Sequence, residues 1–289
     1  MISIEFNKEN LIKSPLNYIG GKFKLLPQIL PRFPDNINTF VDLFCGGGNV
    51  SVNVKANKIY GTDIQKEVIN FLDYCVHNDS KEMLNTINKL VDTYELTKTN
   101  KEGYLKIRKD YNSGNKSWDI FYTLVCYSFN NQIRFNSKGE YNMPFGKDRS
   151  SFNPTLQQKF ISFIDGLKNK DIQFLHKDFR QLKINNLNKN DFVYCDPPYL
   201  ITCASYNESG GWKEKEEKNL LNILDQLNDK GIKFALSNVL ESKGNSNDIL
   251  KEWSKKYIIH RLDAKYGNAN YQRKEKDDST TLEVLITNY

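Results

Sequence analysis

The sequence has 289 residues, enough for one large domain or for one domain that carries a substantial insertion. Hydrophobic residues make up 39% of the chain and charged residues 26%, which is typical of a globular protein and excludes a disordered tail. The formal net charge of +6 suits a nucleic-acid partner, but many unrelated proteins carry as much, so it selects no function alone.

The cysteines and the hydropathy bear on compartment and metal binding. The five cysteines form no C-x-x-C pair, and with three histidines they show no zinc pattern. Cys45, Cys126 and Cys195 lie in apolar runs and are expected to be buried, and the unpaired count favours a reducing compartment. No signal peptide is visible, and no apolar run approaches the roughly 20 residues of a membrane span. We therefore expect a cytoplasmic protein with no metal and no membrane partner.

The first predicted elements are two strands separated by a glycine-rich turn. An apolar run at residues 39–44 leads into Cys45-Gly46-Gly47-Gly48, and a helix is expected near Asn49. Glycines allow a sharp turn and close approach of a ligand. A second strand at residues 58–61 leads to Asp63, where an acid accepts hydrogen bonds from ribose hydroxyls. The pattern is not the Gly-x-Gly-x-x-Gly of dinucleotide enzymes and better suits S-adenosylmethionine, which has no phosphate; a turn without a ligand is the alternative.

The middle of the chain has a different pattern. Residues 66–130 predict successive helices without a strand, and residues 121–129 are strongly apolar and aromatic. Residues 134–145 predict a small hairpin with a turn at Ser137-Lys138-Gly139. Because this stretch interrupts the sheet pattern, we interpret residues 77–150 as an inserted domain, and residues 1–76 and 151–289 as the main domain.

The rest of the chain returns to strands and helices. Asn153 and Pro154 suit the start of a helix over residues 153–167, and residues 214–230 carry one apolar helical face. Strand–helix alternation predicts an α/β fold with a Rossmann-like sheet and helices on both faces. Residues 266–279, rich in Asn, Tyr and Lys, either contact DNA or form a mobile loop. Five further apolar runs predict buried parallel strands, at residues 172–176, 192–195, 233–237, 257–262 and 281–287.

The most informative segment is Asp196-Pro197-Pro198-Tyr199, which follows the strand at residues 192–195. The prolines fix φ and remove two backbone donors, so the carbonyl oxygens of Asp196 and Pro197 have no competing local donors. The carboxylate and the fixed carbonyl are convergent acceptors for an NH2 group, and Tyr199 offers a face to a planar base. Such acceptors localise the lone pair of an exocyclic amine and stabilise positive charge that grows on nitrogen during methyl transfer. A plain turn explains the prolines but neither the acid nor the aromatic residue.

These motifs resemble those of the DNA adenine-N6 methyltransferases in which the cofactor loop comes first, the recognition domain second and the Asp-Pro-Pro-Tyr motif third. Residues 16–22, Leu-Asn-Tyr-Ile-Gly-Gly-Lys, are similar to the family's N-terminal cofactor motif. Residues 130–136 and 139–146 are similar to its DNA-reading hairpin. The resemblance covers nearly the whole chain and implies a methyltransferase domain at residues 1–76 and 151–289, with a DNA-binding target-recognition domain at residues 77–150.

The resemblance implies a site-specific enzyme that transfers the methyl group of S-adenosylmethionine to N6 of a flipped-out adenine in double-stranded DNA. It implies no metal. The implied catalytic residues are Asp196, Pro197, Pro198 and Tyr199. The implied cofactor-binding residues are Tyr18, Lys22, Phe44, Gly46, Gly48, Asp63, Asp178 and Asp196. The implied DNA-binding residues are Asn130, Arg134, Asn136 and Pro144.

Several of these residues have other interpretations. Asp178 either accepts from the cofactor's adenine or caps a helix after a strand. Lys22 contacts the cofactor, a DNA phosphate or only solvent. Arg134 offers a fork to guanine O6 and N7, with a surface salt bridge as the alternative. Phe129 or Phe135 stacks on bases, or packs in the core, and Asn130 can pair with an orphaned base edge.

Two functional alternatives remain. One is methylation of another amine: cytosine N4, an RNA adenine or a protein glutamine. Cytosine enzymes more often have Ser where this chain has Asp196, and glutamine enzymes have Asn. The other is an inactive DNA-binding subunit, against which the intact Asp196-Pro197-Pro198-Tyr199 and glycine loop argue. Gln132 and Ile133 depart from the hairpin of GATC enzymes, so no target sequence is assigned. A bacterial or phage origin and a cognate restriction endonuclease system are the expected context.

Overall fold

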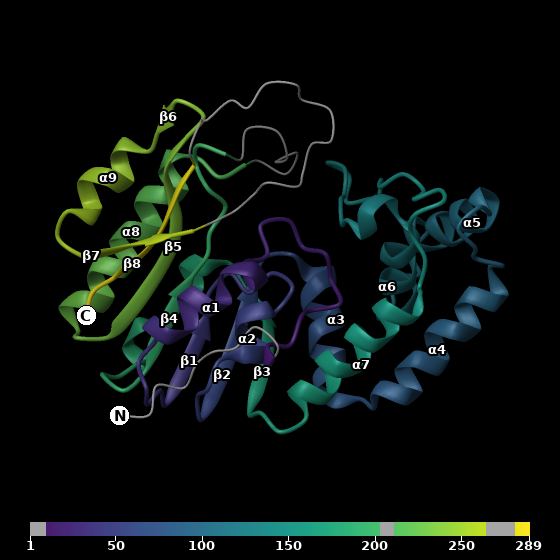
Figure 1. Cartoon of the computed structure of the whole chain (residues 1–289), viewed down its shortest axis with the longest axis horizontal. Helices are drawn as coiled ribbons and strands as arrows, with labels where there is room; N and C mark the ends of the chain where they lie inside the picture. The colour runs from purple at the N-terminus through teal and green to yellow at the C-terminus, as the bar shows by residue number, and fades with distance from the viewer. Residues whose placement is uncertain (1–9, 203–210, 264–280) are drawn as a thin grey trace.

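A computed structural model of the chain describes residues 10–202, 211–263 and 281–289, and its centre is a single sheet (Figure 1). The strand order is β3-β2-β1-β4-β5-β8-β7, and β6 pairs with the end of β5. The predicted α/β fold is confirmed. The strands are β1 (Thr39–Asp42), β2 (Lys58–Asp63), β3 (Ile172–His176), β4 (Phe192–Cys195), β5 (Lys233–Ser242), β6 (Asn245–Ser246), β7 (Ile258–Leu262) and β8 (Leu282–Thr287).

The direction of the strands decides which residues meet. Strands β3, β2, β1, β4 and β5 are parallel, as predicted. The prediction is wrong for β8, which runs antiparallel to both β5 and β7. Because β1 pairs with both β2 and β4, the glycine loop, Asp63 and Asp196 follow neighbouring strand ends. The reversed direction of β8 places its first residues at that same edge, where Glu283 pairs in register with Val239 of β5.

Helices cover both faces of the sheet, also as predicted. On one face, α1 (Leu26–Ile29), α2 (Asn49–Asn53) and α3 (Lys66–His77) contribute to a core that includes Phe40 of β1. On the other, α8 (Glu214–Asp229) and α9 (Asp248–Ser254) pack on β5, in a core that includes Val41. Because successive side chains of β1 point to opposite faces of the sheet, this strand contributes to both cores. No helix in the described part of the chain is long and apolar enough to cross a membrane.

A group of helices extends from the end of the sheet beyond β3 (Figure 1). It contains α4 (Ser80–Thr93), α5 (Lys101–Asn112) and α6 (Trp118–Tyr127), and α7 (Pro154–Leu167) leads back to the sheet. Tyr122 of α6 stacks on Phe71 of α3 with ring centroids 4.7 Å apart, and on Phe160 of α7 at 5.0 Å. These rings join the inserted helices to the layer that covers the sheet.

The predicted hairpin forms without regular strands. Single bridges join Ser128 to Phe145 and Phe135 to Tyr141, and Gly139 takes φ +73° at the turn. The side chain of Asn112 on α5 accepts from the backbone nitrogen of Tyr141 and donates to its carbonyl oxygen, at 2.8 and 3.1 Å. The hairpin is thus fastened to the helices by side chains rather than by an extended ladder.

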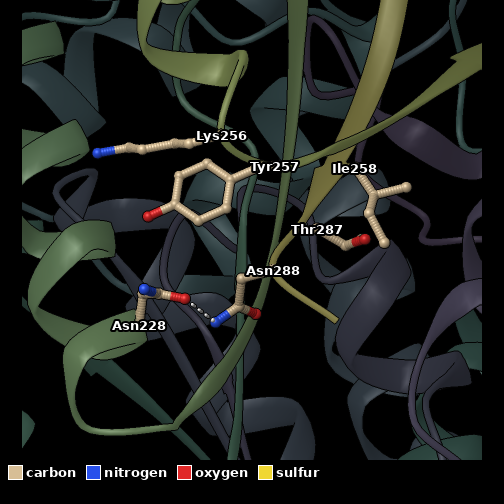
Figure 2. A pocket seen from close by; sticks show the side chains of 6 residues that line it. All are labelled: Asn228, Lys256, Tyr257, Ile258, Thr287 and Asn288. Atoms are coloured by element: carbon tan, nitrogen blue, oxygen red, sulfur yellow. Dashed lines mark hydrogen bonds between the residues drawn. The ribbon is translucent and has the colours of Figure 1, made fainter.

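Some sequence features fall outside the site or outside the described residues. Cys45, Cys126 and Cys195 are buried free thiols, as predicted, and so is Cys75. Cys203 and the whole stretch at residues 266–279 lie outside the described residues. A pocket of about 180 Å³ lies near the end of β8 that is remote from Glu283 (Figure 2). It is lined by Asn228, Lys256, Tyr257, Ile258, Thr287 and Asn288.

Candidate active site

The glycine loop brings three of the predicted cofactor residues together. Gly46 takes φ +47° and Gly48 takes φ +77°, conformations that L side chains rarely adopt. A Cβ at Gly46 would lie 2.9 Å from Cδ1 of Tyr18, so the absence of a side chain lets the tyrosine ring rest on the loop. The backbone nitrogen of Gly46 donates to Oδ2 of Asp63 at 3.0 Å. Tyr18, Gly46 and Asp63 therefore meet in one corner at the ends of β1 and β2.

Asp42 also lies at this corner, and the sequence reasoning assigned it no role. Its Oδ2 accepts from the Ser51 hydroxyl at 2.6 Å, whereas Oδ1 is buried without a hydrogen-bond partner among the described residues. Burial raises the pKa of Asp42, the hydrogen bond from Ser51 lowers it and the charges of Asp196 and Asp63 raise it, which together bring it to about 7. The signal was present: an acid ends a buried strand directly before a glycine loop.

Three aromatic side chains form a cluster beside the loop. The ring of Phe44 lies 5.4 Å from that of Phe179 and 5.6 Å from that of Trp212, measured between centroids. Phe179 and Trp212 are 5.4 Å apart. The indole nitrogen of Trp212 donates to the buried Glu217 at 2.5 Å, which fixes the indole. Phe44 was a predicted cofactor residue, while Phe179 and Trp212 were not singled out.

Asp178 precedes Phe179 and forms the helix cap that was its alternative interpretation. It begins the short helix η5 (Phe179–Gln181), with a capping box completed by Gln181. Arg180 holds both carboxylate oxygens through its side chain, at 2.7 and 2.6 Å, and its hydrogen bonds lower the pKa of Asp178. A contact of Asp178 with cofactor remains a prediction.

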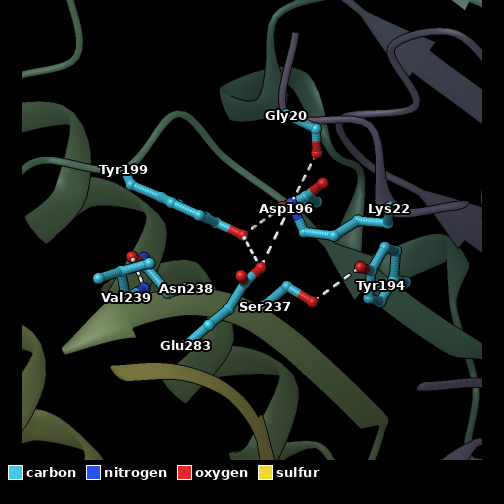
Figure 3. Close-up of polar contacts among 9 residues, drawn as sticks. All are labelled: Gly20, Lys22, Tyr194, Asp196, Tyr199, Ser237, Asn238, Val239 and Glu283. Carbon is cyan, nitrogen blue, oxygen red and sulfur yellow. Dashed lines mark hydrogen bonds and ion pairs between the residues drawn. The ribbon is translucent and has the colours of Figure 1, made fainter. Parts of the chain in front are cut away.

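The residues around Asp196 form a compact polar cluster (Figure 3). The ammonium of Lys22 lies 2.9 Å from Oδ1 of Asp196, donates to the Gly20 carbonyl at 2.8 Å, and lies 3.7 Å from Oε1 of Glu283. Lys22 is 5% exposed, so its interpretation as a plain solvated lysine is wrong. Its nitrogen also lies 4.8 Å from the centroid of the Tyr199 ring.

Tyr199 joins the two carboxylates of this cluster. Its hydroxyl lies 3.1 Å from Oδ1 of Asp196 and 3.0 Å from Oε1 of Glu283. Pro197 is buried and Pro198 exposed, in keeping with a rigid strand-to-loop turn. Glu283, on β8, is fully buried and was missed from the sequence, although a glutamate inside an apolar strand is itself a signal.

Opposing effects set the acidity of Asp196. Burial raises its pKa, the ammonium of Lys22 lowers it and the charge of Glu283 raises it, and together these effects bring it to about 6. At neutral pH the group is therefore largely ionised, yet it is closer to its pKa than an exposed aspartate. A carboxylate in this state both stabilises positive charge and exchanges a proton readily.

The predicted DNA-binding residues lie apart from this cluster, on the hairpin. Arg134 is exposed, and its guanidinium is oriented by Asn142 through Oδ1 at 2.8 Å and the carbonyl at 2.9 Å. The side chain of Asn136 closes the turn by accepting from the backbone nitrogens of Lys138 and Glu140, both at 3.0 Å. Asn136 thus has a structural role that the sequence did not indicate.

Four further residues of the hairpin differ in whether they are exposed or packed against the core. Asn130 and Pro144 are exposed, and the Asn130 carbonyl accepts from the side chain of Asn17 at 2.8 Å. Phe129 is 38% exposed. Phe135 instead stacks on Phe121 of the core, with ring planes 16° apart, as its packing alternative expected. Of the two candidate stacking residues, Phe129 is exposed and Phe135 is partly buried.

No group of three or more His, Cys, Asp or Glu side chains suited to a metal occurs among the residues that the structure describes. The chemistry of the corner is instead that of backbone donors, aromatic rings and buried carboxylates. Such a donor set favours a nucleoside-like ligand that carries positive charge.

Comparison with known proteins identifies a matching family and several relatives. A family model described as D12 class N6 adenine-specific DNA methyltransferase matches residues 18–268. The chain is 50% identical over 282 residues to the type II methyltransferase M.FokI of Planomicrobium okeanokoites, which covers 96% of this chain and 43% of that protein. It is 44% identical over 284 residues to the modification methylase StsI of Streptococcus sanguinis, with the same coverage of 96% and 43%.

The chain thus spans less than half the length of these two relatives. A shorter relative is the type II methyltransferase M1.LlaDCHI of Lactococcus lactis subsp. cremoris, which is 29% identical over 301 residues. That alignment covers 99% of this chain and 98% of the relative. The matched region therefore also occurs as a protein of similar length.

Proposed function

The chain belongs to the D12 class N6 adenine-specific DNA methyltransferases, and on that premise we propose that it transfers the methyl group of S-adenosylmethionine to N6 of an adenine in double-stranded DNA. The observation that carries the proposal is the cluster at the end of β4. There a carboxylate on a proline-fixed turn lies beside an aromatic ring, at the same edge of the sheet as the glycine loop.

The residues at the corner fit S-adenosylmethionine. The buried Oδ1 of Asp42, which has no hydrogen-bond partner in the described part of the chain, suits the ammonium of the amino-acid part. The close approach permitted by Gly46, together with Asp63, suits a ribose, and the cluster of Phe44, Phe179 and Trp212 suits an adenine ring. We assign these residues, with Tyr18, Lys22 and Gly48, to cofactor binding. When bound, the cofactor supplies an electrophilic methyl group on a sulfonium.

The chain's own residues prepare the amine. Because Lys22 and Tyr199 both engage Oδ1 of Asp196, we assign Oδ2 to the first N–H of the target amine. The Pro197 carbonyl accepts the second N–H, and the two hydrogen bonds localise the lone pair on N6. The face of Tyr199 stacks on the base. Asp196 stabilises the positive charge that develops on N6, and the proton that N6 loses passes to Oδ2 of Asp196 or to solvent.

We assign target recognition to residues 77–150. A base inside a duplex cannot reach Asp196, so the adenine is flipped out, at a cost of a few kcal/mol. Support comes from the exposed side chains of Asn130, Arg134 and Pro144 on one hairpin, with Phe129 presenting a ring that can stack on a neighbouring base. By analogy with type II relatives, we propose a cytoplasmic enzyme that protects DNA against a cognate endonuclease.

The direct test is methyl transfer from labelled S-adenosylmethionine to unmethylated genomic DNA, followed by identification of the modified nucleosides. The expected product is N6-methyladenine from wild type and none from Asp196→Ala. Label in N4-methylcytosine would instead support cytosine N4 as the position that is methylated. Label only in parallel RNA or protein reactions would replace DNA as the substrate, and cofactor binding with no transfer to any substrate would indicate an inactive binding subunit.

A further inference from the structure

Glu283 is a fully buried carboxylate near the start of β8, a largely apolar strand. Burial of an ion costs several kcal/mol after relaxation, so such a residue needs charged or polar partners. The antiparallel direction of β8 carries Glu283 to the edge of the sheet that holds Asp196. Its Oε1 lies 3.0 Å from the Tyr199 hydroxyl and 3.7 Å from the Lys22 ammonium (Figure 3).

Among the described residues, this cluster joins one cation and two carboxylates. Lys22 lies between Asp196 and Glu283, at 2.9 and 3.7 Å from their oxygens. Lys22 alone with Asp196 would be a neutral pair, with no net attraction for a cation. Glu283 therefore adds a second carboxylate at the place where the proposed reaction moves positive charge from sulfur to nitrogen.

The Tyr199 hydroxyl adds a geometric constraint. It has one proton and lies within hydrogen-bond distance of Asp196 and of Glu283. Anchoring of the hydroxyl between two carboxylates fixes the ring whose face is assigned to the target base. Glu283 thus affects both the electrostatic potential around Asp196 and the orientation of the Tyr199 ring, without touching the reacting atoms.

We propose that Glu283 is a positioning residue of the methyl transfer, which holds Lys22 and Tyr199 and adds a second carboxylate beside Asp196. The proposal rests on the proposed function. It goes beyond it in assigning a role to a residue outside the Asp-Pro-Pro-Tyr motif. The titratable groups that face Glu283 are Lys22, Asp196, Tyr199 and Tyr194.

The test compares wild type with Glu283→Gln, which keeps size and hydrogen bonding but removes the charge. We expect kcat/KM to fall about 100-fold, since a charge a few ångströms away in a largely buried site is lost. Affinity for S-adenosylhomocysteine, which is neutral at sulfur, is expected to change less than about threefold, because the corner at Asp42 and Gly46 is untouched. The matched control is Glu241→Gln on β5, a 53% exposed acid paired with Lys251.

A second readout does not depend on methyl transfer. Carboxyl-carbon NMR of aspartate-labelled protein follows the titration of Asp196, assigned through Asp196→Asn. Because the Glu283 charge raises the pKa of Asp196, Glu283→Gln is expected to titrate at lower pH than wild type. In the Lys22→Met background, where the ammonium that Glu283 holds is absent, the same substitution is expected to reduce kcat/KM less.

The outcomes separate the two proposals. If Glu283→Gln leaves kcat/KM within about threefold of wild type, or leaves the Asp196 titration unchanged, the role of Glu283 is overturned. Parallel loss of fold and of S-adenosylhomocysteine binding would also overturn it, in favour of a purely structural role. If wild type itself makes no N6-methyladenine, the proposed function fails, while the Asp196 titration still decides whether Glu283 acts on that carboxylate.

Discussion

The ammonium of Lys22 lies 2.9 Å from Oδ1 of Asp196, although 174 positions of the sequence separate the two residues. Lys22 belongs to the segment before β1, and Asp196 follows β4, the next strand of the sheet after β1. The pair therefore links the N-terminal motif to the Asp-Pro-Pro-Tyr motif. It also leaves Oδ2 of Asp196 for the proposed amine.

Removal of this ammonium is expected to change the pH dependence of methyl transfer. Lys22 lowers the pKa of Asp196, so Lys22→Met moves that pKa above its value of about 6. Since the ionised form is the active one, the acid limb of kcat/KM moves to higher pH, with a loss of about tenfold near pH 6.5. A pH profile of wild type, Lys22→Met and the exposed control Lys24→Met measures this. An unmoved acid limb in Lys22→Met would contradict the assignment.

Asp42 is expected to make stability fall as pH rises. Its pKa is raised from 3.8 to about 7 in the folded protein, so the folded state binds a proton more tightly than the unfolded state between these values. Asp42→Asn removes this penalty and is expected to stabilise the cofactor-free protein at pH 8 by an amount on the order of 4 kcal/mol. Urea unfolding at pH 5 and pH 8 measures the difference, with the exposed Asp35→Asn as control.

The same substitution is expected to weaken cofactor binding. Replacement of the carboxylate removes the partner assigned to the cofactor's ammonium, which corresponds to a roughly 10- to 100-fold loss of affinity. Calorimetric titration with S-adenosylmethionine measures it. Unchanged affinity in Asp42→Asn would show that Oδ1 faces another group.

A methyl group at Gly46 is expected to close the cofactor corner. Gly46→Ala places a Cβ 2.9 Å from the Tyr18 ring and also carries the strain of φ +47°. Gly244→Ala, with φ +78° and nothing within 4 Å of its Cβ, carries strain without a clash. We expect both variants to lose about 1 kcal/mol of stability, and only Gly46→Ala to lose affinity for cofactor. Equal affinities in the two variants would refute a cofactor site at this loop.

Arg134 is expected to read a base rather than to bind DNA generally. Its guanidinium is oriented by Asn142, so Arg134→Ala should lower discrimination at one base pair by about 1–3 kcal/mol. Lys106→Ala, an exposed cation on α5, serves as the control. Competition binding with single-base variants of the methylated site measures both proteins. A uniform loss across all variants would assign Arg134 to the phosphate backbone instead.

Much of the sheet could be predicted from the sequence. The bounds of β3 and β4 agree with the apolar runs at residues 172–176 and 192–195, because each run is short and bounded by polar residues. The direction of β8 could not be predicted, since an apolar run looks the same in either direction. The extension of β5 to Ser242 was also missed, because Asn238 and Glu241 interrupt the apolar pattern. Asn238 is nevertheless buried, and its side chain donates to Glu217 at 3.3 Å.

The site could be predicted only in part, because the sequence does not show which distant residues the sheet brings together. Motif residues such as Asp196 and Gly46 stand out because their local sequence is unusual. Glu283 contacts Lys22 and Tyr199, which are far away in the chain, and only the sheet brings these residues together. Asn136 illustrates the opposite case, since a residue predicted to touch DNA forms its hydrogen bonds within its own turn.

The most direct test of adenine methylation at Asp196 is base-resolved sequencing of N6-methyladenine in a bacterial host that lacks adenine methylation. Wild type and Asp196→Ala are expressed at equal levels, and the genome of each host is read. The account predicts N6-methyladenine at nearly every copy of one short sequence in cells with wild type, and none in cells with the variant. Its absence from both, or its equal presence in both, would contradict the account.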